Sequence, residues 1–225
     1  MFISLEGIDS SGKKTQIDLL EKKLVEKGHK VERIDFPMYE TPFGKLVAAY
    51  LRGELGKIEH VVPEASALLY ALDRYQFKEE LEKKIKTDTV VITNRYTQSN
   101  LAFQGAKLEG PEQDHFIKWI EDMETRLPQP SLVIFLDMPP QAAKKLGHDS
   151  RKYMEGKDTN YDIHEENSGY QEKVRQVYLR LALKKGWLVV NCAIKEGDEW
   201  KLRSPEEIHE KVWERVEKML TWRSG

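Results

Sequence analysis

Glycine and lysine residues near the N-terminus have the types and the spacing of a phosphate-binding loop. Gly7, Gly12 and Lys13 fit the pattern G-x-x-x-x-G-K. In such a loop, backbone N–H groups surround phosphate oxygens and the lysine reaches the terminal phosphates. The pattern predicts a site for a nucleoside triphosphate, built from Gly7, Ser10, Ser11, Gly12, Lys13, Lys14 and Thr15.

The residue after the loop lysine departs from this pattern. Lys14 stands where such loops carry a Ser or Thr whose hydroxyl coordinates Mg²⁺. One interpretation is that the Lys14 ammonium takes part of the metal's role and neutralises the β- and γ-phosphate oxygens. The other is that Lys14 points outward from the first helical turn. The Thr15 hydroxyl, one residue later, is better placed for an α-phosphate and is not assigned to the metal.

Two arginines occupy positions suited to recognising an anion or a base edge. Arg95 follows the apolar run TVVIT, which places it at the carboxyl end of a strand, where its guanidinium fork can clamp a phosphate. Arg74 falls in an otherwise apolar helical stripe with Tyr70 and Phe77, and a buried guanidinium needs an acceptor. The alternatives are a surface ion pair for Arg95 and, for Arg74, a packed stem with its head group in water.

These residues must be held by alternating strands and helices. Short apolar runs, which predict strands, alternate with longer helical patterns, one of them a single long helix over 63–86. The runs are MFISLEG, KVERIDF, DTVVIT, SLVIFLD and GWLVVNCAI. Strands that alternate with helices predict a three-layer α/β fold with a parallel five-stranded sheet, as one domain over 1–225. Ligands of such sheets bind beyond the carboxyl ends of the strands.

Two further segments have clear local signals. Ser204, Pro205 and Glu207 form a capping box that predicts the start of the last helix. Residues 147–169 are polar and lack apolar periodicity, which is typical either of a mobile lid or of a solvated excursion.

Composition excludes several classes of protein. Lys and Arg number 36 against 38 Asp and Glu, so no global basic field favours nucleic acid. The longest apolar runs are far below the roughly 20 residues of a membrane helix, and no signal-peptide layout is seen, so we expect a cytoplasmic protein without a membrane partner. The single cysteine, Cys192, excludes an internal disulfide.

Several stretches in the same order resemble the thymidylate kinase family. They are FISLEGIDSSGKKTQ, DFPMYETPFGKLV, LLYALDRYQF, NRYTQSNLAFQGA, LVIFLDMPPQAA and DIHEENSGYQEKVRQVYLRLA. The resemblance covers nearly the whole chain and implies a P-loop kinase fold that makes dTDP from dTMP, with ATP as donor and Mg²⁺ as cofactor. It also implies a homodimer.

The resemblance further implies roles for individual residues. Arg74 would contact the thymine edge, Tyr70 would stack on the base, and Phe103 would crowd the position of a ribose 2′-hydroxyl. Lys13, Arg95, Asp9 and the lid residue Arg151 would be catalytic, with Lys152 and Lys157 as other lid candidates. The implied substrate-binding set is Asp9, Phe36, Tyr39, Tyr70, Arg74, Arg95, Ser99, Asn100 and Phe103.

Asn94 is a second departure, because the family usually has an aspartate before Arg-Tyr. Together, Lys14 and Asn94 remove metal-binding chemistry, so the metal ligands stay unassigned, with Asp9 as one candidate. Two alternatives therefore remain open. The chain could phosphorylate another nucleotide or a nucleoside, or it could bind nucleotides while transferring phosphate poorly.

Overall fold

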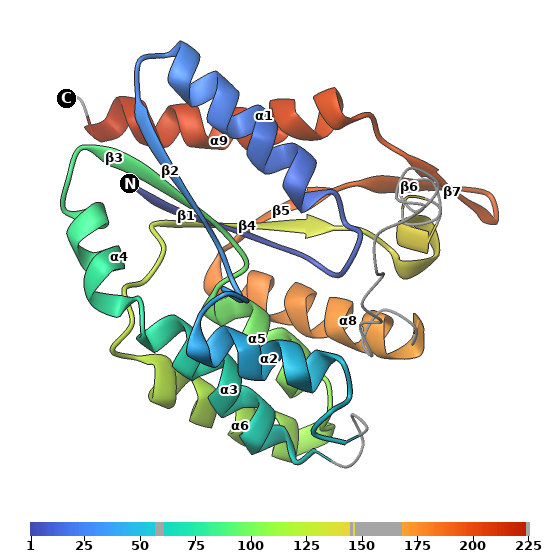
Figure 1. The fold of residues 1–225 in the computed structure, drawn as a ribbon. Helices are drawn as coiled ribbons and strands as arrows, with labels where there is room; N and C mark the ends of the chain where they lie inside the picture. Colours follow the sequence, from blue (N-terminus) through green and yellow to red (C-terminus); the bar gives the residue numbers. More distant parts are fainter. Residues whose placement is uncertain (57–60, 145, 147–167, 224–225) are drawn as a thin grey trace, which may run out of the picture.

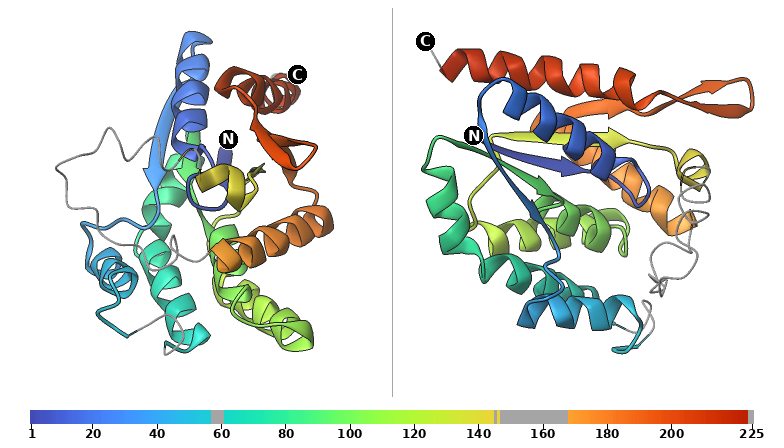
Figure 2. Two further views of the ribbon diagram at one scale, coloured as in Figure 1. Left: turned by 90° about the vertical axis from the view of Figure 1, so that its right-hand side faces the viewer. Right: turned by 45° about the horizontal axis from the view of Figure 1, so that its top comes forward.

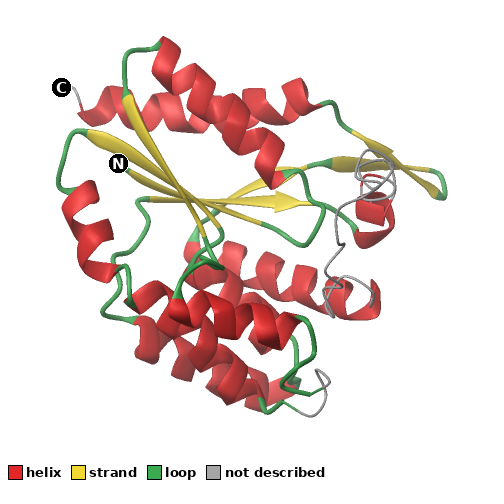
Figure 3. Ribbon diagram, viewed as in Figure 1, coloured by secondary structure: helices red, strands yellow, loops and turns green. Residues whose placement is uncertain are grey.

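The computed structural model describes residues 1–56, 61–144, 146 and 168–223. Its centre is a five-stranded parallel sheet in the order β2-β3-β1-β4-β5 (Figures 1 and 3). Ile3 on β1 pairs with Ile92 on β3 and with Leu132 on β4, so β1 is the middle strand. The strands are β1 Phe2–Glu6, β2 Lys30–Asp35, β3 Thr89–Asn94, β4 Leu132–Asp137 and β5 Leu188–Asn191. This is the α/β architecture that the alternating sequence pattern predicts.

Helices cover both faces of the sheet. Helices α1 and α9 lie together on one face, and α5 and α8 lie on the other (Figure 1). Helices α2, α3 and α6 form a further layer outside α5, as the turned views show (Figure 2). The helices are α1 Lys13–Glu26, α2 Pro42–Leu51, α3 Pro63–Tyr75, α4 Lys78–Ile85, α5 Thr97–Gly105, α6 Gly110–Glu124, α8 Ser168–Lys185 and α9 Pro205–Arg223.

Burial explains why the central strands are continuous apolar runs. Every residue of β1 and β4 is buried, because helices pack on both sides of the middle of the sheet. Residues such as Ile3, Leu5, Ile92 and Phe135 join helices α1, α5 and α8 in one core cluster. This rigid centre holds the loops at the carboxyl ends of β1 and β3.

The long helix expected over 63–86 is wrong, because the structure has two helices there. Helix α3 ends at Tyr75 and α4 begins at Lys78. The Gln76 amide donates to Thr41 Oγ1 at 2.9 Å, and the Phe77 ring packs edge-on against Phe36. These contacts to a distant loop outweigh the local helical pattern at the turn between the two helices.

The C-terminal part adds a small hairpin that the sequence pattern did not predict. The last strand expected over GWLVVNCAI ends at Asn191, and a two-stranded antiparallel sheet follows, β6 Ala193–Glu196 and β7 Glu199–Leu202. The charged stretch KEGDEWKLR thus forms a turn, with Gly197 at φ +63°, and a returning strand. The predicted capping box is confirmed, since the Glu207 N–H donates to Ser204 Oγ and the Ser204 N–H to Glu207 Oε2.

Candidate functional site

The loop between β1 and α1 has the backbone shape of an anion cradle. Gly7 has φ +156°, and a Cβ there would lie 2.5 Å from Ser11 Oγ and 3.0 Å from Leu136 O. Gly12, at φ +85°, caps the start of α1 in the left-handed conformation, and Ser10 also has a positive φ. Glycine at position 7 is therefore required both by conformation and by space.

Lys13 is folded into this loop. Its ammonium donates to Ile8 O at 2.7 Å and, at 3.3 Å, to Gly7 O and Ser11 Oγ. Burial, together with the nearby Arg95 cation, lowers the pKa of Lys13 to about 7. A buried ammonium surrounded by neutral acceptors is poised for an anion, which would restore its ordinary pKa.

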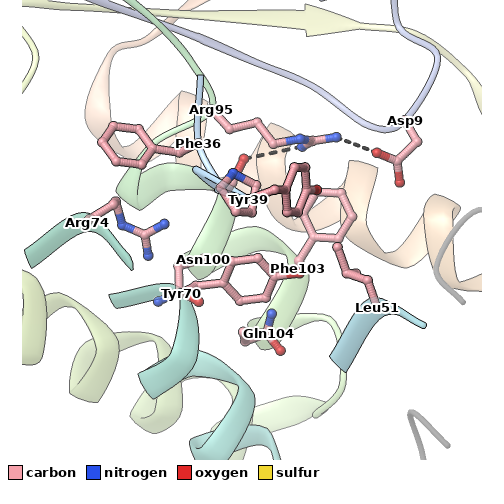
Figure 4. A pocket seen from close by; sticks show the side chains of 12 residues that line it. Asp9, Phe36, Tyr39, Leu51, Tyr70, Arg74, Arg95, Asn100, Phe103 and Gln104 are labelled. Carbon is pink, nitrogen blue, oxygen red and sulfur yellow. Dashed lines mark hydrogen bonds and ion pairs between the residues drawn. The ribbon is translucent and has the colours of Figure 1, made fainter. Parts of the chain in front are cut away.

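Arg95 connects this loop with the pocket beside it. Its backbone has φ +66°, a conformation uncommon for residues other than glycine, in the turn after β3. Its guanidinium donates to Gly7 O at 2.8 Å. It also donates to the Asp9 carboxylate, as Figure 4 shows. Burial opposes the charge of Arg95, but Asp9 together with Tyr178, Glu6 and Tyr39 outweighs this effect and holds the Arg95 pKa above its usual value.

A pocket opens beside Arg95 and gathers all nine side chains of the substrate-binding set implied by the sequence (Figure 4). Phe103 lies beneath the Arg95 guanidinium, 4.8 Å from ring centroid to Cζ. Tyr70 and Arg74 come from α3, and Asn100 and Phe103 from α5. Pro37, Leu51 and Gln104 complete the lining, and sequence reasoning missed these three.

A buried ion pair lies behind one wall of the pocket. Arg74 donates from Nε at 2.8 Å and from Nη2 at 2.5 Å to the same oxygen of Glu124, the last residue of α6. Both side chains are only 2% exposed. The acceptor that a buried Arg74 needs is therefore Glu124, and the alternative with the head group in water is wrong.

A second carboxylate holds the loop that carries Phe36 and Tyr39. Asp73 on α3 accepts hydrogen bonds from the Met38 N–H and from the Gln76 amide. Burial raises the pKa of Asp73, and these hydrogen bonds oppose that rise. Phe36 is buried at the pocket, whereas Tyr39 is 47% exposed at its rim.

Two polar groups behind Arg95 were also missed by sequence reasoning. Glu6, at the end of β1, accepts hydrogen bonds from Ser99 Oγ at 2.6 Å and from the Tyr178 hydroxyl at 3.0 Å. Gln171 on α8 donates to Asp9 Oδ2 at 2.7 Å. Neither Glu6 nor Gln171 carries a local sequence signal for these contacts, because Ser99, Tyr178 and Asp9 each lie more than 90 residues from the residue they bond.

A thymidylate kinase family model matches residues 5–201. A probable thymidylate kinase of Pyrobaculum aerophilum is 33% identical over 224 residues, with 99% of each chain covered. A probable thymidylate kinase of Thermococcus onnurineus is 36% identical over 81% of this chain and 84% of its own. The human thymidylate kinase is 29% identical over 80% of this chain and 75% of its own.

The chain belongs to the thymidylate kinase family. Its fold agrees with a solved thymidylate kinase structure from Candida albicans, with a TM-score of 0.71, 24% identity and coverage of 96% of this chain and 91% of that one. Thymidylate kinases phosphorylate dTMP with ATP as donor and Mg²⁺ as cofactor. The chain is thus an enzyme, and the alternative of a binding protein with weak catalysis is not favoured.

The residues present fit the donor polyphosphate. A left-handed glycine cradle and the buried Lys13 ammonium supply the donors and the charge that phosphate oxygens need. The fit to a metal held by the protein alone is poor, since the described ranges hold no group of three or more His, Cys, Asp or Glu able to bind one. Mg²⁺ binds in kinase sites largely through substrate phosphates and water, which agrees with this donor set.

The two departures at the metal position have different surroundings. Lys14 is exposed on the first turn of α1, outside the lining of the pocket. Asn94 is half-buried at the end of β3, and within the described chain its Oδ1 meets no hydrogen-bond donor. Asp9 is already engaged by Arg95 and Gln171.

The lid expected over 147–169 lies almost entirely outside the described residues. Residues 147–167, and with them Arg151, Lys152 and Lys157, lie outside the described residues. Ser168 and Gly169, the last two residues of the expected lid, belong to α8. No helix of the described chain is long and apolar enough to cross a membrane.

Proposed function

We propose that this chain, as a single catalytic domain, transfers the γ-phosphoryl group of ATP to dTMP and yields dTDP and ADP. The observation that carries the proposal is the contact between the phosphate loop and the neighbouring pocket through Arg95, which donates to Gly7 O and to Asp9. A nucleoside monophosphate in that pocket would present its phosphate to the loop. Family membership supports thymidylate as the acceptor.

On the donor side, loop N–H groups and Lys13 bind the polyphosphate. Lys13 exchanges its loop carbonyl partners for phosphate oxygens and neutralises charge that develops during transfer. Ser10, Ser11, Gly12 and Thr15 form the rest of the cradle, with Lys14 at its outer edge. Mg²⁺, bound with ATP, would supply further positive charge to the phosphate oxygens.

On the acceptor side, Arg95 binds the phosphate of the nucleoside monophosphate, and Asp9 fixes the Arg95 guanidinium through their ion pair. The Arg95 guanidinium can donate to two phosphate oxygens at once. Its position over the Phe103 ring fixes the plane of the guanidinium. We expect Asp9, which lines the pocket, also to meet the sugar 3′-hydroxyl of the bound nucleotide. Tyr39, at the rim, is positioned to meet the same phosphate.

The base occupies the inner part of the pocket. Tyr70 and Phe36 provide aromatic faces, while Arg74 and Asn100 provide polar groups for the base edge. Phe103 narrows the pocket beside the sugar and favours a deoxyribose. Ser99 links Arg95 to Glu6 beneath the pocket.

The test is the initial rate of phosphorylation of dTMP, dUMP, dCMP and dGMP by ATP, across a Mg²⁺ titration that includes EDTA. We expect turnover selective for dTMP and abolished by EDTA. Arg95→Lys keeps the charge but loses the fork, so kcat/KM should fall by about 100-fold. Absence of dTMP turnover by the unaltered enzyme, or a larger rate with another acceptor, would reject the proposal.

We also propose that the chain acts as a homodimer in the cytoplasm. Leu68 and Leu72, one turn apart on α3, are 43% and 39% exposed, and Trp119 on α6 is 38% exposed. These apolar side chains are suited to a contact between two copies. Sedimentation should show a dimer for the unaltered protein and a monomer for Leu72→Lys, whereas Leu183→Lys on α8 is the matched control. A monomeric unaltered protein would contradict the dimer.

A further inference from the structure

The Arg74–Glu124 pair lies directly behind the base pocket. Both donors on one edge of the Arg74 guanidinium, Nε and Nη2, end on Glu124 Oε1. Glu124 thereby fixes the plane of the guanidinium. Among the described residues no acceptor meets Nη1, so the N–H groups of the other edge stay available to a ligand. Figure 4 shows the Arg74 head group at the pocket, between Phe36 and Tyr70.

Asn100 stands near the same carboxylate and has a defined orientation. Its Nδ2 donates to the Ala67 carbonyl at 3.1 Å, and because a carbonyl can only accept, the amide cannot be reversed. Its Oδ1 is buried and, within the described chain, has no partner. Burial raises the pKa of Glu124, and Arg74 and Asn100 both oppose this rise, which puts the carboxyl group within reach of the two side chains.

The pocket wall therefore offers a donor from Arg74 close to an acceptor from Asn100. A pyrimidine with a carbonyl at C4 and an N–H at N3 presents the complementary pair. Cytosine presents an amino group and a bare ring nitrogen. Its amino group would face the Arg74 donor, so two donors would meet. A site built to hydrogen-bond one pattern rejects the other strongly, because its buried polar groups are left unpaired.

We propose that Glu124 is a positioning residue that fixes Arg74 and so sets the preference for a 4-oxo over a 4-amino pyrimidine. This inference rests on the proposed function and adds a residue that does not itself line the pocket. Glu124 acts through Arg74. Its contribution therefore falls on acceptor recognition and not on the transfer step.

The test compares kcat and KM for dTMP, dUMP and dCMP in the unaltered enzyme, in Glu124→Gln and in Asp122→Asn. Asp122 is an exposed acid on the same helix, paired with Lys118, and serves as the control. In Glu124→Gln we expect KM for dTMP to rise at least about tenfold, kcat to change much less, and the dTMP-to-dCMP ratio of kcat/KM to fall by at least about tenfold. Asp122→Asn should match the unaltered enzyme.

A second pair of variants separates positioning from a general structural role. In an Arg74→Gln background, Glu124→Gln should cause no further loss of selectivity, because the group it positions is already gone. The double variant also leaves no unpaired buried charge, so it should fold even where Glu124→Gln does not. Glu124→Asp keeps the charge but withdraws it, and should lose part of the selectivity.

The outcomes are distinguishable. An unaltered enzyme that does not phosphorylate dTMP rejects the proposed function. Normal dTMP turnover together with an unchanged dTMP-to-dCMP ratio in Glu124→Gln or Glu124→Asp rejects the positioning role alone. A uniform loss of kcat with all three acceptors, or a further loss of selectivity in the double variant, would also overturn it.

Discussion

At the scale of single residues, the most unusual position is Lys14. It places a second cation beside Lys13 where related loops use a hydroxyl for the metal, and it is exposed on the first turn of α1. A lysine there interacts unfavourably with the helix dipole unless a bound anion compensates its charge. An arriving polyphosphate would supply that anion, and Lys14 would then carry part of the neutralisation usually left to Mg²⁺.

Lys14→Thr should therefore weaken ATP binding severalfold at low Mg²⁺ and make turnover depend more steeply on the metal. Isothermal calorimetry with and without Mg²⁺, together with rates across a Mg²⁺ titration, measures both effects. Lys22→Thr, at an exposed position further along the same helix, is the control. Unchanged ATP affinity and an unchanged Mg²⁺ profile in Lys14→Thr would contradict a role for the ammonium.

Residues with a chemical signature could be predicted from the sequence, and residues that support them could not. Loop residues Gly7 and Lys13 follow a motif, and Arg95 follows from its position after a strand. In the sequence, Glu124 and Gln104 resemble ordinary helix residues. They differ only in the side chains that α3 and α5 bring near them. Their roles depend on long-range packing, which spacing along the chain does not record.

At the scale of elements, the loop that carries Phe36 and Tyr39 depends on the break between α3 and α4. Gln76 lies at that break and joins Thr41 of the loop to Asp73 of α3. A helix that continued through Gln76 would remove this connection. The prediction of one long helix is thus wrong at the point where contacts to the site, and not the local sequence pattern, determine the backbone.

Asp73→Ala should destabilise the fold and loosen the loop that carries Phe36. The change leaves the Met38 N–H without its acceptor and removes one of the acceptors of the Gln76 amide. We therefore expect a loss of about 1–3 kcal/mol in the free energy of unfolding and a higher KM for dTMP. Urea denaturation and steady-state kinetics measure the two effects. Asp88→Ala, on an exposed turn, should change neither, and an unaltered KM in a destabilised Asp73→Ala would show that the loop does not need this anchor.

The elements were predictable where local signals agree with burial. The capping box at Ser204 and the apolar runs of β1 and β4 are such cases, because local preference and tertiary packing favour the same conformation. The hairpin β6–β7 was missed because its polar strands alternate too briefly to resemble a strand pattern. Its turn at Gly197 is the one cue that the sequence offers.

At the scale of the whole molecule, a second lysine with a lowered pKa, which is half-buried, affects stability. Lys107, which follows α5, donates to Ser66 Oγ and to the Tyr50 hydroxyl, with no carboxylate of the described residues as partner. Burial lowers its pKa to about 8. The unfolded chain therefore binds more protons than the folded one between about pH 8 and the ordinary lysine pKa, so stability should rise with pH across this window.

Lys107→Met should flatten this rise, because the replacement cannot titrate. Urea denaturation at several pH values between 7 and 10 would compare the two proteins, with Lys86→Met, an exposed lysine, as the control. We expect the gain in stability with pH to be smaller in Lys107→Met than in the control. Equal slopes for the two variants would show that the Lys107 ammonium is compensated in the folded state.

The arrangement of Lys13 has a consequence for the thermodynamics of nucleotide capture. With its pKa near 7, the empty site holds a partly neutral amine at physiological pH, and polyphosphate favours the charged form. Each nucleotide bound above neutrality is thus accompanied by uptake of part of a proton from the buffer. The calorimetric heat of ATP binding at pH 7.5 should therefore be less exothermic in Tris than in phosphate, because Tris releases its proton at a greater enthalpic cost. In Lys13→Met this difference between buffers should shrink. That result would show that the unaltered enzyme binds the polyphosphate together with a proton.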